Sequence, residues 1–324
     1  MKLLVLDGNS IINRAFYGIK LLTTKDGRYT NAIYGFMNIF YKLCDELHPD
    51  SVAFAFDLKA PTFRHKMYDE YKAGRKPMPP ELAEQMPVLK DLLKALGYKI
   101  VTKEGYEADD ILGTLAFSCK DGDECYIATG DRDSLQLVGD NVKVLLASTK
   151  MGRPETNIYD VKRIKEDYGV TPHQLIDIKA LMGDSSDNIP GVSGVGQKTA
   201  QSLISELGSI QNIYDNIDTI DIRETLRNKL KNDKDSAFMS YKLGEICKSV
   251  PIETDYSFYV PDEGDKGEAL SILRSLEMYK LIDKIGLNTV TYDAKPENTI
   301  VNEYKRVNSL NDFLLKANKL YFVY

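Results

Sequence analysis

The 324-residue sequence has no tryptophan, three histidines and four cysteines. Because Cys44, Cys119, Cys125 and Cys247 form no Cys-x-x-Cys pair, a zinc site is not expected. The histidines lie far from any serine or cysteine nucleophile motif, which argues against a Ser-His-Asp or Cys-His hydrolase. Scattered cysteines, and a start that turns polar too early for a signal peptide, indicate a reducing cytoplasm.

Long hydrophobic runs are also missing, and no apolar stretch approaches the ~20 residues of a membrane span. With 28% charged and 43% hydrophobic residues, the composition is that of a globular protein with room for two or three domains. The formal net charge of −6 argues weakly against a polyanionic partner. Residues 59–76, however, hold six Lys or Arg against two acids. They mix cations with aromatic side chains, as segments that grip a nucleic-acid backbone do, although a solvated basic helix has a similar composition.

One stretch, residues 183–200 (GDSSDNIPGVSGVGQKTA), combines two kinds of chemistry. Its first half carries Asp184 and Asp187, and a helical turn there would place both carboxylates on one face. Its second half predicts a glycine-rich hairpin that opens a helix, with free backbone N–H groups and a lysine for a phosphate. The candidate backbone-binding residues are Gly191, Ser193, Gly194, Gly196 and Lys198.

Short apolar runs alternate with helical patterns in the first half of the chain. We predict strands over residues 2–6, 52–56, 98–101, 125–128 and 142–146, with amphipathic helices over residues 33–47 and 81–96. This alternation favours an α/β fold with a central, mostly parallel sheet and helices on both faces. In such sheets functional groups lie beyond the carboxyl ends of the strands, which is where Asp7 and Asp57 stand.

Further acids follow the later strands. Glu107, Asp109 and Asp110 crowd the start of a helix and exceed what capping of its dipole requires. Asp131 and Asp133 follow the fourth strand, and an extended backbone would aim both side chains the same way. With the four acids named above, these make nine candidate ligands.

Nine clustered carboxylates require cations. One like-charge pair at ~5 Å and an effective dielectric constant of ~20 costs about 3 kcal/mol. Oxygen ligands select hard ions, so we predict Mg²⁺ or Mn²⁺. Two such ions suit phosphodiester hydrolysis, in which they activate a water and stabilise the leaving oxygen.

The chain after Tyr159 is mainly helical in its pattern. We predict helices over residues 160–168, 172–182, 196–207, 222–230, 234–246 and 267–282, a polar linker over 289–301, and a strand over 319–324. That strand either pairs with the main sheet or, as we prefer, begins a further domain that this chain does not contain. The expected domains are residues 1–170, 171–288 and 289–324.

The motifs LDGNSIINRAF, AFD, YKAGR, GYEADD, TGDRDSLQL and GDSSDNIPGVSGVGQKTA, in this order, resemble the 5′ nuclease (flap endonuclease) domain of bacterial DNA polymerase I over residues 1–288. The resemblance implies a PIN-like nuclease core with a helical arch over 1–170. A helix–three-turn–helix DNA-binding subdomain would follow over 171–288. Residues 289–324 are similar to a linker and the truncated start of the proofreading-type domain, so no polymerase activity is expected.

Carried over by motif, the resemblance implies two ligand sets for two Mg²⁺ or Mn²⁺ ions. The first set is Asp7, Asp57, Glu107, Asp109 and Asp110. The second set is Asp131, Asp133, Asp184 and Asp187, with Asp109 or Asp110 serving both ions.

The resemblance also implies DNA contacts. Lys72 would polarise the scissile phosphate with help from Arg75, and Tyr71 would stack on the entering nucleotide. Arg64 belongs to the same basic segment and is a further candidate contact. The hairpin glycines and Lys198 would hold the duplex backbone, where the family often binds K⁺.

We therefore predict a monomeric hydrolase of the bacterial cytoplasm, associated with the nucleoid and not with a membrane. It would cleave DNA at 5′ flaps or at 5′ ends of duplex junctions, and remove RNA primers from their hybrids with DNA, in replication and repair. An aspartyl-phosphate phosphatase is one alternative, but it requires Asp-x-Asp after the first strand, where this chain has Asp-Gly-Asn. A non-enzymatic DNA-binding module is the other, and it leaves the nine acids unexplained. The sequence leaves the preference between flap and exonuclease cleavage open.

Overall fold

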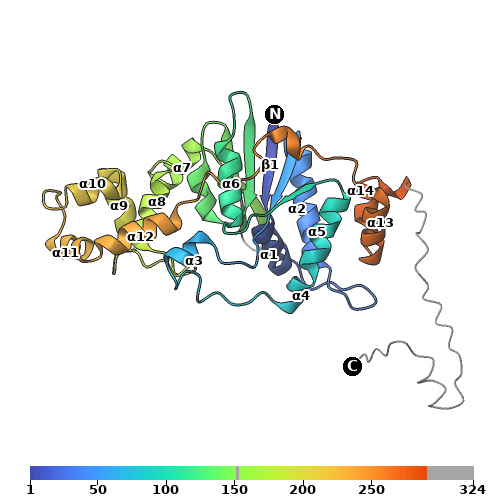
Figure 1. Cartoon of the computed structure of the whole chain (residues 1–324), viewed down its shortest axis with the longest axis horizontal. Helices are drawn as coiled ribbons and strands as arrows, with labels where there is room; N and C mark the ends of the chain where they lie inside the picture. The colour runs from blue at the N-terminus through green and yellow to red at the C-terminus, as the bar shows by residue number, and fades with distance from the viewer. Residues whose placement is uncertain (151–152, 290–324) are drawn as a thin grey trace, which may run out of the picture. The chain divides into compact units, whose positions relative to one another are not determined.

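The computed structural model describes residues 1–150 and 153–289 (Figure 1). Within these residues six strands form one sheet in the order β3-β2-β1-β4-β5-β6. The strands are β1 (Lys2–Asp7), β2 (Ser51–Ala55), β3 (Lys99–Val101), β4 (Glu124–Thr129), β5 (Val142–Lys150) and β6 (Arg153–Tyr159). Neighbours from β3 to β5 pair in parallel, and β6 pairs antiparallel with β5 at the edge. The predicted α/β fold with a mostly parallel sheet is confirmed.

Helices cover both faces of the sheet (Figure 1). Those of the first half are α1 (Gly8–Gly18), α2 (Asn31–Leu47), α3 (Phe63–Met67), α4 (Pro80–Ala83), α5 (Gln85–Ala95), α6 (Ala108–Phe117) and the 3₁₀ helix η1 (Arg132–Leu137). Alternate residues of a strand point to opposite faces. Leu4 and Leu6 of β1 therefore pack in the cluster that contains α1, α2 and α5. Leu3 and Val5 pack in the cluster that contains α6. Burial on both faces explains why the strands are continuous apolar runs.

The second half of the described chain is helical apart from β6. Its elements are α7 (Val161–Tyr168), α8 (Gln174–Met182), α9 (Gln197–Leu207), α10 (Ile210–Asp215), α11 (Glu224–Asn232), α12 (Lys234–Gly244), η2 (Tyr256–Tyr259), α13 (Lys266–Ser275), α14 (Tyr279–Lys284) and η3 (Leu287–Thr289). Helices α8 to α12 share their own apolar core and form a helical subdomain. The chain then returns to the sheet, where η2 and α13 join the two sheet-covering clusters. None of the helices in the described ranges is long and apolar enough to cross a membrane.

Some elements differ from the prediction. β6 and α1 were not predicted, and the expected helix over residues 267–282 is two helices, α13 and α14. The break falls at Glu277, whose φ is 57°, a left-handed conformation that ends a helix. The arch implied by the resemblance is mostly not helical, since residues 68–79 between α3 and α4 form turns and irregular chain. The predicted linker and terminal strand lie outside the described residues.

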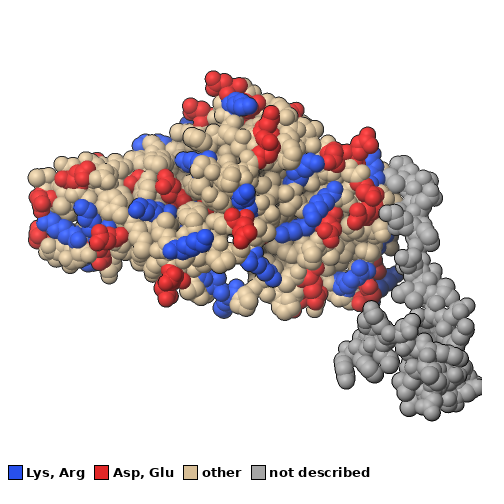
Figure 2. Space-filling model, viewed as in Figure 1, with Lys and Arg blue, Asp and Glu red and all other residues tan. Residues whose placement is uncertain are grey.

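The order of the strands reverses between β1 and β4, which are parallel neighbours, so that their carboxyl ends lie side by side. Such a reversal opens a crevice beyond the strand ends, where ligands bind in open α/β sheets. Figure 2 shows that Lys, Arg, Asp and Glu side chains are interspersed over the face that it presents. No single sign of charge dominates this face.

Candidate active site

The first group of carboxylates surrounds a pocket of about 420 Å³ at the carboxyl ends of β1, β2 and β4. Its acidic lining residues are Asp7, Asp57, Glu107, Asp109 and Asp131. Lys72 and Arg75 line the same pocket. Five of the predicted acids thus meet in one place, and Asp131, assigned to the second ion, lies with the first group.

Local hydrogen bonds fix these acids in place. Asp7 ends β1 and caps α1, accepting from the backbone N–H of Ser10 at 2.9 Å and from the Thr129 hydroxyl at 2.9 Å. Asp131 caps η1 and accepts from the N–H of Asp133 at 2.9 Å. Asp131 has the extended backbone that was predicted, but Asp133 lies in the 3₁₀ helix, so the prediction was wrong for Asp133.

The start of α6 contributes two more acids. Glu107 is the N-cap residue of α6, and Asp109 lies in the first turn. Asp57 accepts from the N–H of Ala108 at 2.7 Å, which attaches the end of β2 to the same helix start. Capping therefore explains how these acids are positioned, but they also converge on the pocket with Asp7.

The electrostatics of this group favour a bound cation. Burial, together with the nearby Asp57 charge, raises the pKa of Asp7 to about 7, although N–H and hydroxyl donors oppose the shift. Burial, with Asp7 and Asp131 adding repulsion, raises the pKa of Asp109 well above its ordinary value. A hard divalent ion with oxygen ligands would remove this repulsion, so the donor set fits Mg²⁺ or Mn²⁺.

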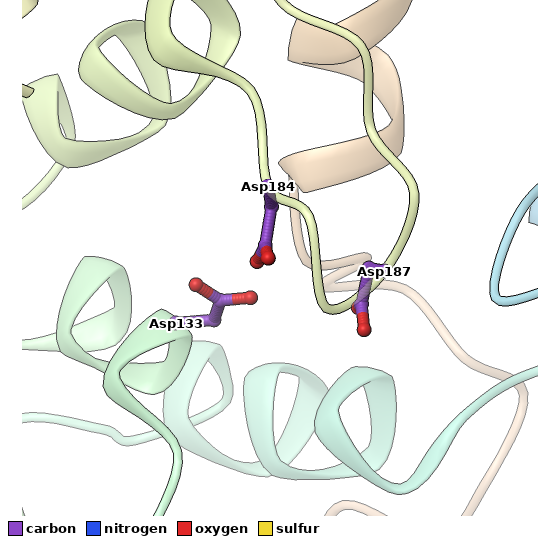
Figure 3. Close-up of side chains that lie close together, drawn as sticks. All are labelled: Asp133, Asp184 and Asp187. Carbon is purple, nitrogen blue, oxygen red and sulfur yellow. The ribbon is translucent and has the colours of Figure 1, made fainter. Parts of the chain in front are cut away.

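The second group consists of Asp133, Asp184 and Asp187, whose carboxylate oxygens lie within 4.8 Å of one another (Figure 3). Asp133 comes from η1, and the other two come from the turn after α8. In Figure 3, Asp133 and Asp184 point toward one another. This geometry fits a second hard cation as well.

The turn that carries Asp184 and Asp187 is not helical, but it brings both carboxylates to one place, as a helical turn would have done. Asp184 and Ile189 exchange two backbone hydrogen bonds of 2.8 Å, which close a tight loop. Gly183 and Gly191 have φ of 71° and 64°, and a Cβ on Gly191 would lie 2.3 Å from the Gly183 nitrogen. Both positions therefore require glycine, which explains the spacing of this part of the stretch.

Lys179 lies within the second group of carboxylates and was not among the predicted site residues. It lies on α8, is 8% exposed, and its ammonium pairs with Asp133 and with Asp184, the latter at 2.7 Å. Burial lowers the pKa of Lys179, but the two carboxylates more than offset it and raise the value. Burial opposes the shift at Asp184 too, yet the Lys179 ammonium and Ser186 lower its pKa to about 2. A lysine on a mostly apolar helix, four residues before the carboxylate-bearing turn, was the available signal.

Lys72 and Arg75 connect the two groups. The Lys72 ammonium lies 2.9 Å from Glu107 and 3.8 Å from Asp187, while Arg75 lies 2.5 Å from Asp187. The N–H of Lys72 also donates to the backbone carbonyl of Asp187 at 2.9 Å. The basic segment therefore reaches both carboxylate groups, as expected of residues that handle a phosphate between them.

Three residues that were predicted to bind metal or DNA are buried among other protein groups. Asp110 is fully buried, and Arg64, 2% exposed, donates to both of its carboxylate oxygens at 2.8 Å. Asp110 is thus not presented to an ion, and Arg64 is not presented to DNA. Tyr71 is 3% exposed and packs with Ile189 and Leu243, so its ring has no open face for a base.

The glycine-rich hairpin lies in the turn between α8 and α9, as predicted. Gly196 is the N-cap residue of α9. Because glycine has no side chain, it offers no acceptor to the backbone N–H groups of the first turn of α9. A Cβ on Gly196 would meet no atom within 4 Å. Ser193, Gly194 and Lys198 are exposed, whereas Gly191 is buried against the turn.

Two family models match the chain. Residues 2–169 match "5′-3′ exonuclease, N-terminal resolvase-like domain", and residues 170–266 match "5′-3′ exonuclease, C-terminal SAM fold". The first match alone covers more than half of the chain. Together the models span both carboxylate groups and the hairpin.

The chain is also similar to DNA polymerases I. That of Caldicellulosiruptor bescii is 42% identical over 327 residues, covering 100% of this chain and 38% of that protein. That of Bacillus subtilis (strain 168) is 42% identical over 286 residues, covering 88% and 32%. The chain spans about a third of the length of these relatives.

Among solved structures, a bacteriophage T5 5′-exonuclease with bound zinc ions has a TM-score of 0.62 at 23% identity, covering 85% of this chain and 99% of that one. A T5 flap endonuclease in a pseudo-enzyme–product complex with DNA and metal ions has a TM-score of 0.60 at 21% identity, covering 89% and 99%. At these identities the likeness establishes the fold.

Proposed function

Because the chain belongs to the 5′-3′ exonuclease family, we propose that it is a metal-dependent nuclease that hydrolyses DNA at 5′ flaps and at 5′ ends of duplex junctions. One observation carries the proposal. Two groups of carboxylates, at strand ends and in the glycine-closed turn, lie on either side of Lys72, whose ammonium contacts both. This is the arrangement expected where a phosphodiester is held between two hard cations.

We assign two ions, Mg²⁺ or Mn²⁺, to these groups. Asp7, Asp57, Glu107, Asp109 and Asp131 would hold one ion, and Asp133, Asp184 and Asp187 the other. When bound, the ions supply an activated water and charge stabilisation for the leaving oxygen. The solved structures of similar proteins that contain metal ions support this assignment.

The chain's own residues orient the substrate. Lys72 and Arg75 exchange carboxylate partners for a phosphate, and they oppose the charge that develops on it. The left-handed backbone of Lys72, with φ of 58°, is held by its hydrogen bond to the turn of Asp187, so the ammonium is positioned before DNA binds. Arg64, Asp110 and Tyr71 are left out of the direct contacts.

The hairpin would hold the duplex. Gly194, Gly196, Ser193 and Lys198 form an open surface at the start of α9, which suits a phosphate oxygen. The same hairpin residues would hold K⁺, whose charge would offset that of the DNA backbone. A DNA complex of a similar protein supports a duplex partner. The same proposal includes RNA primers on DNA as a second substrate. It also includes a monomeric state and a place in the bacterial cytoplasm near the nucleoid, and it includes no polymerase activity.

The test is digestion of one end-labelled 5′-flap DNA in saturating Mg²⁺ and in EDTA. We expect cleavage only with Mg²⁺. Asp109→Asn removes a buried ligand but keeps its shape, so it should abolish cleavage while flap binding persists. Asp91→Asn, exposed on α5, is the matched control and should cleave normally. Cleavage in EDTA, or an Asp109→Asn rate within about tenfold of the parent (1.4 kcal/mol of barrier), would contradict the proposal.

A further inference from the structure

Arg64 uses every donor that it has inside the protein. A guanidinium carries five N–H donors, and all five are bonded here. Nε donates to the Leu243 carbonyl at 2.9 Å, and one terminal nitrogen donates to Asp110 at 2.8 Å and to Glu107 at 3.4 Å. The other terminal nitrogen donates to Asp110 at 2.8 Å and to the Glu245 carbonyl at 2.8 Å. Such a residue fixes the distances between the segments that it joins.

Those segments come from three parts of the chain. Arg64 belongs to α3, and Glu107 and Asp110 belong to the start of α6 beside the proposed ligand Asp109. Residues 243–247 are the end of α12 and the chain directly after it. Asp110 also accepts from the N–H of Cys247 at 2.9 Å. The carboxyl end of α12 is thus attached to the helix start that presents two acids of the first group, Glu107 and Asp109.

Helix α12 is also attached to the hairpin, by contacts that run from its N-cap residue to Ser240. The Ser240 hydroxyl accepts from the N–H of Gly191 at 2.9 Å, and the Ser236 hydroxyl donates to the Gly191 carbonyl at 2.6 Å. The N–H of Ser193 donates to Asp233, the N-cap residue of α12, at 2.7 Å. Helix α12 therefore runs as a continuous rod from the proposed duplex-binding hairpin to Arg64.

We propose that α12 and Arg64 couple duplex binding at the hairpin to the placement of the carboxylates at the start of α6. Arg64 is a positioning residue in this scheme, and the inference rests on the proposed function. A duplex held by the hairpin fixes α12, and the rigid fork of Arg64 passes that constraint to Glu107 and Asp110. A downstream duplex then speeds the chemical step as well as strengthening binding.

The geometry makes the fork essential. Lysine keeps the charge but offers a single nitrogen, which cannot bond the Leu243 and Glu245 carbonyls and both Asp110 oxygens together. Arg64→Lys should therefore leave an ion pair with Asp110 while loosening the end of α12. The hairpin itself is untouched by this change, so duplex affinity should stay within about threefold of the parent.

The experiment compares two flap substrates that differ only in the length of the downstream duplex. For each variant we measure the single-turnover rate in saturating Mg²⁺ and the affinity without cleavage, and take the long-to-short ratio of the rates. We expect the long-to-short ratio of the parent to be well above one. In Arg64→Lys this ratio should fall by about fivefold or more, which is within the usual range of coupling between sites. Ser236→Ala, in the amino-terminal half of α12, removes a hydrogen bond to Gly191 and should lower the same ratio. The double variant should lower it no further, because both changes interrupt one connection.

Ile213→Ala is the matched control, because it removes core packing of the same helical subdomain but none of the hydrogen bonds that join α12 to the hairpin and to Arg64. Its ratio should equal that of the parent. A parent ratio near one would overturn the inference, and so would an unchanged ratio in Arg64→Lys. A loss of affinity in Arg64→Lys that matches the loss of rate would overturn it too. Absence of Mg²⁺-dependent cleavage by the parent would instead overturn the proposed function.

Discussion

Lys72 stands where the two carboxylate groups meet, and its backbone φ of 58° is unusual for a side-chain-bearing residue. We predict that Lys72→Ala lowers the single-turnover rate by ~10²–10³, as loss of a preorganised charge at a reacting group does, and weakens binding much less. Rapid-quench kinetics on a labelled flap would measure the rate, and anisotropy the affinity. Lys66→Ala, exposed on α3, is the control and should keep the parent rate. A loss confined to affinity would make Lys72 a backbone contact only.

Individual site residues also show which features could be predicted from the sequence and which could not. The carboxylates were identifiable because they follow strand ends and helix starts, and eight of the nine line one of the two groups. Asp110 could not be distinguished from Asp109 by sequence, since a helix turns its neighbour by about 100°, toward the core. Arg64 also faces inward. Its helix, α3, has only five residues and no clear periodicity, so the inward direction could not be predicted. Tertiary packing decides such cases.

At the scale of elements, the hairpin before α9 yields a prediction that concerns duplex binding and not the chemical step. Gly196 has open space around the site of a Cβ, so Gly196→Val with Lys198→Ala should fold normally but block the approach of a phosphate. Affinity for flaps with a long downstream duplex should fall, while short substrates are spared. Lys198 adds one ionic contact, so the slope of log affinity against log salt should shrink by about one unit.

Affinity titrations at several salt concentrations would measure both effects. Lys162→Ala, an exposed lysine on α7 outside the hairpin, is the control and should leave the slope unchanged. Equal losses on long and short substrates would show that the hairpin does not hold the duplex.

Elements differ in how much their sequence reveals. The parallel strands were predictable because each is a buried apolar run, and the long helices because their apolar residues recur every three or four positions. β6 gave no such signal, because it is an edge strand of largely polar sequence that includes Pro154. The break between α13 and α14 carries neither glycine nor proline. There, the burial of Leu276 and Met278 on either side of Glu277 fixes the chain path.

At the scale of the whole molecule, residues Met1–Val290 form one compact unit that contains both carboxylate groups and the hairpin. We predict that a chain ending at Val290 keeps Mg²⁺-dependent flap cleavage within about twofold, and a Tm within about 2 °C of the full chain, because no contact described here is lost. Parallel assays and differential scanning fluorimetry of the two chains would check this. A larger drop in either quantity would show that the remaining residues support the nuclease.

The buried acids make stability depend on pH and metal together. Burial raises the pKa of Asp7 to about 7 and that of Asp133 to about 6, both above the unfolded value of about 3.9. A carboxyl with a raised pKa binds more protons in the folded state, so its contribution is fully present below the unfolded pKa. That contribution is lost as the pH rises through the folded value. In EDTA, we therefore predict that the Tm falls between pH ~5 and pH ~8.

Mg²⁺ should reverse that fall. The ion binds the folded, deprotonated carboxylates, so it stabilises the native state by mass action, and more at pH ~8 than at pH ~5.5, where protons compete. Scanning fluorimetry across this range, with and without saturating Mg²⁺, would measure the two slopes. Asp7→Asn should flatten the slope in EDTA, because the amide does not titrate, while Asp91→Asn should keep it. The Asp184 carboxyl, whose pKa Lys179 and Ser186 lower against the effect of burial, titrates below this window and should not contribute. A Tm in EDTA that rises toward pH ~8, or an equal Mg²⁺ effect at both ends, would mean that the carboxylates are not held together as the structure places them.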